Sequence, residues 1–194
     1  MTLMRRVLNP LAAAGCVLAI SGVAPPLLAS GFNSTVQLQG IRFVVQSRDQ
    51  GAGQQLTITT TGTQRPIPVI QQQVDGSVVG AEVADLNADG QPEILVFVQK
   101  SGSGRHGLLV GYALNNGRSL TPITLPALSK ALAQGYRGHD SFAVVERCLA
   151  RRFPLDRPGG ASGASSAVVY RQICYKLQAG EAGWMLRPVS VATF

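Results

Sequence analysis

The sequence predicts an all-β protein, an antiparallel β-sandwich or barrel of about eight strands with one short helix. Apolar and polar residues alternate along much of the chain, and helical periodicity is scarce. Glycine (22 residues) and proline (11) are frequent, which is typical of a chain with many turns. Hydrophobic residues make up 45% and charged residues 14%, and this composition excludes an acidic or basic disordered tail.

Residues 1–30 have the three parts of a secretory signal peptide. Arg5 and Arg6 are followed by an apolar stretch, and the segment ends on the small residues Ala29 and Ser30. A membrane anchor is the alternative, but prolines and glycines interrupt the stretch too often for a stable spanning helix. We therefore expect a cleaved signal, a periplasmic location without a membrane anchor, and a single β domain over residues 31–194.

The mature chain is predicted to contain one disulfide. Loss of Arg5 and Arg6 lowers the net charge from +7 to +5, and only Cys148 and Cys174 remain after cleavage. In an exported protein such a pair is usually oxidised. If the two cysteines lie directly opposite each other on a hairpin, the turn is centred at Ala161.

The elements follow from alternation and from turn residues. Asp75-Gly76 and the Asn-Asn-Gly run at 115–117 predict tight hairpin turns, because both tolerate positive φ angles. Residues 127–134 predict the one helix, between Pro126 and Gly135. A glycine- and serine-rich loop is predicted over residues 156–166. The predicted strands are 41–45, 56–60, 66–74, 77–86, 94–99, 108–114, 141–153, 167–177 and 184–192.

The 85–93 loop has oxygen-bearing side chains at alternate positions. Asp85, Asn87, Asp89 and Glu93 could converge on a hard cation such as calcium, with Gly90 allowing a sharp turn. The alternative, which we favour, is a tight loop in which the Asp and Asn side chains bond to their own backbone. In either case this loop supports the fold and does not specify a reaction.

Two local patterns resemble enzyme motifs but lack the required context. The glycines from Gly102 to Gly107 match a dinucleotide-binding pattern, yet a predicted strand follows where a helix is needed. His139, Asp140 and Ser141 are consecutive, and consecutive residues seldom form a triad, so a polar corner is expected there. We therefore predict no enzymatic activity and no resident cofactor apart from the calcium alternative.

The basic charge does not indicate nucleic-acid binding. The arginines are dispersed, with one cluster at Arg147, Arg151 and Arg152. No aromatic stacking platform accompanies that cluster, so we expect these arginines to lie on a solvated strand face.

Two runs carry a family resemblance. They are DLNADGQPEILVFVQKSGSGRHGLLVGYALNNGRSL and GYRGHDSFAVVERCLARRFPL. Together they resemble the periplasmic inhibitors of invertebrate-type lysozyme found in Gram-negative bacteria. This resemblance implies a small antiparallel β fold without enzymatic activity that is often dimeric, so a homodimer is expected. It also implies a lysozyme as partner, blocked by a loop that carries a serine and a tyrosine.

The implied inhibitory element is the loop from Ser101 to Gly107. Ser103 stands where the family serine is expected, and His106 stands where the tyrosine is expected. Lysozymes cleave with two carboxyl groups, to which Ser103 and His106 could each offer a hydrogen bond. Arg105 and the positive net charge would favour approach to an acidic cleft. An alternative function is a calcium-stabilised periplasmic β module that binds another partner or an envelope component.

Overall fold

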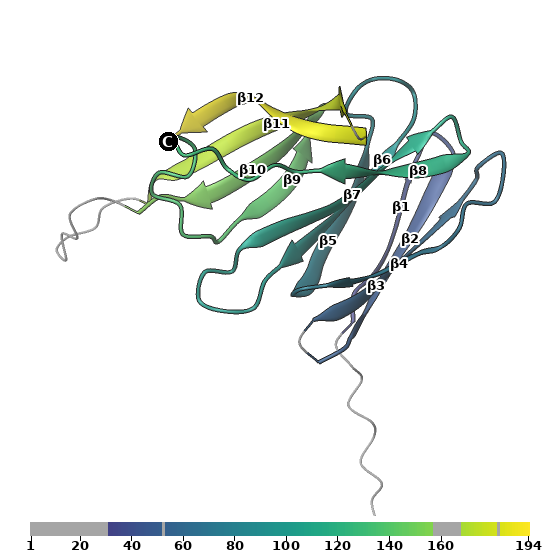
Figure 1. Cartoon of the computed structure of the whole chain (residues 1–194), viewed down its shortest axis with the longest axis horizontal. Coiled ribbons are helices and arrows are strands. Elements are labelled where there is room, and N and C mark those ends of the chain that lie inside the picture. The colour runs from purple at the N-terminus through teal and green to yellow at the C-terminus, as the bar shows by residue number, and fades with distance from the viewer. Residues whose placement is uncertain (1–30, 52, 157–167, 182) are drawn as a thin grey trace, which may run out of the picture.

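The computed structural model describes residues 31–51, 53–156, 168–181 and 183–194. The predicted signal peptide and nearly all of the predicted glycine- and serine-rich loop lie outside these residues. Within them the chain forms twelve strands in two sheets and contains no helix (Figure 1). The all-β class is thus confirmed, with more strands than the sequence predicted.

The first sheet is antiparallel and contains four strands in chain order. Successive side chains alternate between a buried and a solvent-facing side, so Phe43, Val45, Leu56 and Ile58 are fully buried. The opposite side is rich in threonine and glutamine. The strands are β1 (Asn33–Leu38), β2 (Ile41–Asp49), β3 (Gln54–Thr61) and β4 (Ile70–Val74).

The second sheet has eight strands and curls into a nearly closed barrel. Its two ends meet where the Val144 N–H of β9 donates a hydrogen bond to Glu82 Oε2 of β5, at 2.7 Å. The order is β5-β6-β7-β8-β12-β11-β10-β9. The strands are β5 (Ser77–Ala84), β6 (Glu93–Gln99), β7 (Gly107–Asn115), β8 (Ser119–Thr124), β9 (Ser141–Val145), β10 (Cys148–Pro154), β11 (Tyr170–Gly180) and β12 (Gly183–Thr193).

One strand pair departs from the predicted antiparallel arrangement. β8 pairs with β12 in parallel, and only through Trp184 with Ile123 and Met185 with Thr124. β8 ends at Thr124, and residues 125–129 continue without regular secondary structure.

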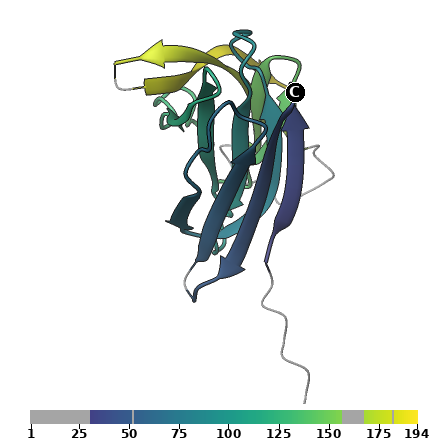
Figure 2. The ribbon, with the colours of Figure 1, turned by 90° about the vertical axis from the view of Figure 1, so that its right-hand side faces the viewer.

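β6 separates two hydrophobic cores. Its residues Ile94, Val96 and Val98 pack against the first sheet, which lies over β5, β6 and β7 (Figures 1 and 2). Leu95 and Phe97 point the other way, into the barrel interior. All five side chains are buried, which explains why this strand is a continuous apolar run instead of an alternating one.

The predicted helix at 127–134 is wrong; the segment is a series of turns. Only one helix-like bond is present, from the Ala133 N–H to the Ser129 carbonyl at 2.9 Å. Arg171 Nη1 donates to the Leu132 carbonyl at 2.8 Å and so occupies a backbone acceptor of this segment. So short a segment does not stay helical without strong tertiary support. In the part of the chain that the structure describes, no helix has the length and apolarity required to cross a bilayer.

Two strand predictions also need correction. Residues 141–153 form a hairpin of β9 and β10 instead of one strand, because Glu146 adopts a positive φ of 57° and reverses the chain. At 66–74 the strand is confined to β4, since Pro66 and Pro68 cannot donate to a sheet ladder.

The predicted disulfide between Cys148 and Cys174 is present and links β10 to β11, with 5.6 Å between the Cα atoms. The cysteines are not directly opposite, however, because Cys174 pairs with Ala150. The bridge is therefore diagonal, and the hairpin is not centred at Ala161. That turn itself lies outside the described residues.

Candidate functional site

The 101–107 loop joins β6 to β7 at one end of the barrel. The Lys100 N–H donates to the His106 carbonyl at 2.9 Å and closes the loop, and Gly102 adopts a positive φ of 113° that favours glycine. Ser103, Arg105 and His106 are all exposed. The three residues predicted to carry an interaction thus lie together at an exposed loop.

A segment distant in sequence, residues 138–140, holds this loop through hydrogen bonds. The His139 N–H donates to the Gly104 carbonyl at 2.7 Å, and Asp140 Oδ2 accepts the Gly107 N–H at 2.7 Å. Gly138 lies so close to the Gly104 carbonyl that a side chain at this position could not be accommodated. The predicted polar corner is therefore a structural support for the loop.

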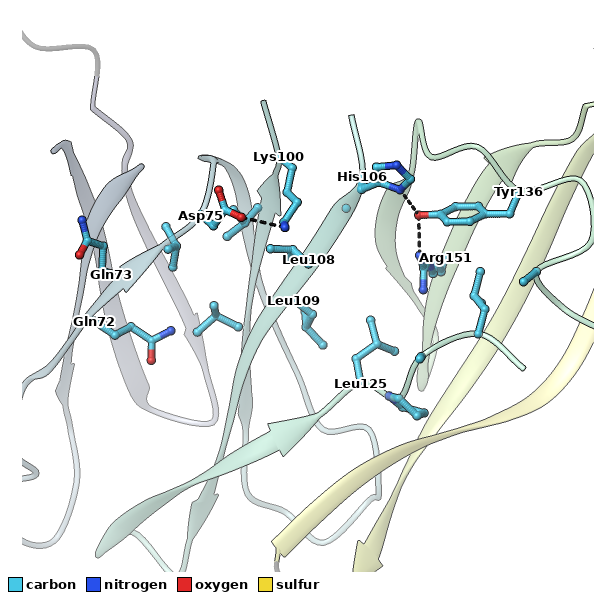
Figure 3. A pocket seen from close by; sticks show the side chains of 18 residues that line it. Gln72, Gln73, Asp75, Lys100, His106, Leu108, Leu109, Leu125, Tyr136 and Arg151 are labelled. Atoms are coloured by element: carbon cyan, nitrogen blue, oxygen red, sulfur yellow. Dashed lines mark hydrogen bonds and ion pairs between the residues drawn. The ribbon is translucent and has the colours of Figure 1, made fainter. Parts of the chain in front are cut away.

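Tyr136 connects the loop to a buried ion pair. Its hydroxyl donates to Asp140 Oδ2 at 2.6 Å. The same oxygen accepts from Arg151 Nη2 at 3.0 Å and lies 3.1 Å from His106 Nδ1 (Figure 3). Because the single hydroxyl proton goes to Asp140, His106 Nδ1 must carry a proton and donate to Tyr136. The ring nitrogen Nε2 is then the one left for an incoming group.

The ion pair beneath the loop is shielded from water. Arg151 Nε lies 2.7 Å from Asp140 Oδ1, and the Asp140 side chain is fully buried. Burial raises the pKa of Tyr136 to about 12, and its hydrogen bond to Asp140 acts in the same direction, so this hydroxyl stays protonated. For Arg151, burial lowers the pKa, but the hydrogen bond and the charge of Asp140 outweigh it and raise the pKa overall. The guanidinium of Arg151 is thus held in its charged form under the loop.

The loop surface is rich in hydrogen-bond donors. Ser103 and His106 line a hollow of about 460 Å³ together with Gly104, Arg137 and His139. None of the described residues that line this hollow is acidic. Arg137 forms an ion pair with Asp156, which is not among the lining residues. This arrangement can receive an acidic group.

Sequence reasoning missed Tyr136, placed Asp140 in a polar corner without a role for it, and misjudged Arg151 as part of a solvated strand face. Arg151 is buried, so the expectation of a solvated arginine cluster is wrong for this residue. A signal for it was present in the sequence. Leu149 and Phe153 alternate with Arg151 and point into the barrel, and an arginine on that face requires a buried partner.

The 85–93 loop lies at the opposite end of β6. Asp85 Oδ1 and Oδ2 accept the N–H groups of Asp89 and Gly90, each at 3.1 Å, and Asp89 Oδ1 accepts the Gln91 N–H at 2.7 Å. Asn87 Oδ1 also accepts the Asp89 N–H, at 3.2 Å. The structure thus has the backbone bonding expected of the cation-free alternative.

Glu93 is set apart from the rest of that loop by its burial. Its Oε2 accepts the Leu86 N–H at 2.7 Å, whereas Oε1 has no partner among the described residues. Burial is the main cause that raises the pKa of Glu93 to about 7; the bond from the Leu86 N–H opposes it, and the charges of Asp89 and Asp85 act in the same direction as burial. No set of three acidic, histidine or cysteine residues in the described chain is placed to hold a metal ion. Calcium binding stays a prediction.

Comparisons with known proteins identify no relatives. No family model matches the chain, and no curated protein or solved structure matches it either.

Proposed function

We propose that this protein is a periplasmic inhibitor of lysozyme, with the invertebrate type favoured, and that the 101–107 loop blocks the catalytic cleft. The observation that carries the proposal is the attachment of an exposed donor-bearing loop to a buried ion pair. Gly107 is bonded to Asp140, and His106 is bonded to Tyr136. A loop already held in one conformation loses less entropy on binding than a free loop does.

The chemistry of the loop suits a pair of carboxyl groups. The Ser103 hydroxyl can donate to a carboxylate. His106 Nε2 accepts from a protonated carboxyl when the ring is neutral, and it donates to a carboxylate when the ring is charged. Glycoside hydrolases of this kind keep one carboxyl protonated and one ionised, so both forms of His106 find a partner.

Charge supports the direction of approach. Arg105 is exposed next to the two donors, and the net charge without residues 1–30 is +5 because Arg5 and Arg6 are removed. A cationic surface accelerates encounter with an acidic cleft and loses this advantage as salt rises.

The test is inhibition of an invertebrate-type lysozyme by purified protein, with goose- and chicken-type lysozymes in parallel. Ser103→Ala and His106→Ala should each raise the inhibition constant about tenfold or more, because each leaves a carboxyl unpaired in a desolvated contact. Arg105→Ala should have a smaller effect, confined to low salt. Ser190→Ala, an exposed serine on β12, is the matched control and should inhibit like the parent.

The variant His106→Tyr distinguishes two hypotheses about the role of the histidine. If the histidine is a weakened form of the family tyrosine contact, the variant inhibits better than the parent. If the histidine adapts the loop to another lysozyme, the variant changes which of the three types is inhibited. Equal inhibition by the parent and by both alanine variants would exclude this loop as the inhibitory element.

A further inference from the structure

A cleft of about 740 Å³ opens where β8 leaves β7 (Figure 3). β8 pairs with β7 only along Gly111–Asn115, so the first half of β7 has no neighbour from β8. Four consecutive residues of β7, from Gly107 to Val110, line the cleft. A strand face would present only alternate residues, so the cleft exposes the hydrogen-bonding edge of β7.

The direction of the backbone groups follows from two hydrogen bonds of β7. The Leu114 N–H donates to the Pro92 carbonyl on the β6 side, at 3.1 Å, whereas the Gly107 N–H donates away from β6, to Asp140. Backbone direction alternates along an antiparallel strand, so Leu109 shares the direction of Gly107. The N–H and C=O of Leu109 therefore face the cleft, and no described strand pairs with them there.

The cleft is apolar on both sides of that edge. Leu109, Leu125 and Leu128 extend the barrel core along one wall. Val74 and Val98, which belong to the core between the sheets, line the other wall. A segment lying along Leu109 would thus place successive side chains into two apolar surfaces.

One end of the cleft carries the side chains of Lys100 and His106, together with Asp75. An added segment that continues the line of β8 runs antiparallel to β7 and ends level with Gly107, beside Lys100 and His106. Lys100 pairs with Asp75 at 2.7 Å, but this pair is solvent-exposed and weak, so Lys100 can turn to a second carboxylate. Arg105 adds positive charge next to this end.

We propose that this cleft binds the C-terminal tail of a partner polypeptide. The tail adds as a short strand to the free edge of β7. Its apolar side chains enter both walls, and its terminal carboxylate lies near Lys100 and His106. Backbone bonds to Leu109 supply the affinity, as in other cases of strand addition at a sheet edge. The proposal does not depend on lysozyme inhibition.

The probe is a synthetic peptide, acetyl-Lys-Thr-Val-Ile-Val with a free carboxyl end, titrated to millimolar concentration into isotope-labelled protein. We expect shifts of the Leu109 and Gly107 amide resonances and protection of the Leu109 amide from hydrogen exchange. The same peptide with an amidated end should bind several-fold more weakly. The same peptide with N-methyl groups on its central amides should not bind, because it cannot form the ladder.

A pair of variants separates the backbone contribution from the side chain. Leu109→Pro and Leu109→Ala both remove the leucine side chain, but only proline also removes the cleft-facing N–H. Leu109→Pro should therefore weaken binding at least about tenfold, and Leu109→Ala should weaken it less. If Leu109→Pro fails to fold, the N-methylated peptide decides alone. The proposal would be overturned if the N-methylated or the amidated peptide bound as well as the parent peptide. It would also be overturned if the Leu109 resonance did not shift, or if the shifts at this site came only from self-association of the protein.

Discussion

The two loops at the ends of β6 differ in where their side-chain hydrogen bonds lead. In the 85–93 loop, the side-chain bonds of Asp85 and Asp89 reach backbone groups at most five residues further along the chain. In the 101–107 loop, His106 and Gly107 are bonded to residues 30 and 33 positions away. The first loop also receives distant bonds, from Gln39 to Asp85 and from the Gly117 N–H to Gln91, but its carboxylates bond mainly within the loop. The second loop depends on the barrel for its side-chain bonds.

The origin of its hydrogen bonds determines whether a loop is better suited to a structural role or to binding a partner. A loop whose carboxylates bond mainly to its own backbone adds stability to the connection between two strands. A loop bonded to a buried ion pair keeps its shape while its exposed side chains stay available to a partner. The comparison agrees with the binding role proposed for the 101–107 loop and the structural role predicted for the 85–93 loop, and four experiments address it.

The largest effect is expected for Asp140→Ala. The Arg151 guanidinium would stay buried without its counter-ion, which typically costs roughly 3–5 kcal/mol. Chemical denaturation should show this loss. Hydrogen exchange of the Gly107 amide should accelerate beyond the global change, because this amide also loses its acceptor.

The double variant Asp140→Leu with Arg151→Met is the control for that experiment. Replacing both charges by apolar groups should recover much of the stability, because neither charge is then left unpaired. The Gly107 amide should still exchange rapidly. Slow exchange of this amide in the double variant would mean that the ion pair does not hold the loop.

Next comes a pH effect at the other end of β6. The pKa of Glu93 is raised to about 7 in the folded protein, above its ordinary value of 4.5, so the folded state binds a proton more tightly. Its contribution to stability is fully present below about pH 4.5 and is lost as pH rises through about 7. With about 1.4 kcal/mol per pKa unit, the loss is on the order of 3 kcal/mol.

Glu93→Gln should remove this pH dependence, because the amide is neutral at every pH used. Denaturation of both proteins between pH 5 and 8 provides the measurement. Parallel stability curves for the parent and Glu93→Gln would show that Glu93 does not take up a proton in this range.

Tyr136→Phe should have a smaller effect. It removes the hydroxyl shared by Asp140, Arg151 and His106 but leaves the ion pair in place. We expect a loss of roughly 1–3 kcal/mol in unfolding free energy, since buried groups lose a partner. Inhibition of a susceptible lysozyme should weaken more than that of the Ser190→Ala control. Unchanged inhibition would contradict a positioning role for Tyr136.

The smallest effect is expected for Asp89→Ala, at about 1 kcal/mol of stability, because the loop is exposed and loses mainly the bond to the Gln91 N–H. Inhibition should not change. Calcium bound by this loop would raise the Tm of the parent and not of the variant. A loss of inhibition without a change in Tm would reverse the roles assigned to the two loops.

Much of the fold could be predicted because it depends on local patterns. Alternation located most strands, and the Asn-Asn-Gly run lies at the turn between the paired strands β7 and β8. The hairpin predicted at Asp75-Gly76 is wrong, because this dipeptide connects β4 to β5, which belong to different sheets. The absence of the 127–134 helix could not be predicted, because Arg171 bonds to this segment from a strand far along the chain. The parallel β8–β12 contact is likewise a tertiary event that leaves no local pattern.

The candidate site divides in the same way. Ser103, Arg105 and His106 were accessible to sequence reasoning as a short glycine-flanked motif. The residues that support them could not be predicted, because Tyr136 and Arg151 are distant in sequence and are brought to the loop only by the folded barrel. The inward-facing position of Arg151 was the one trace of this support in the sequence.

Because β6 forms one wall of both cores, neither core can lose this strand without exposing the other. Opening the first sheet would uncover Ile94, Val96 and Val98, and opening the barrel would uncover Leu95 and Phe97. We therefore expect a single cooperative unfolding transition, seen identically by circular dichroism and by Trp184 fluorescence. The amides of this strand should be among the slowest to exchange, and only through global unfolding.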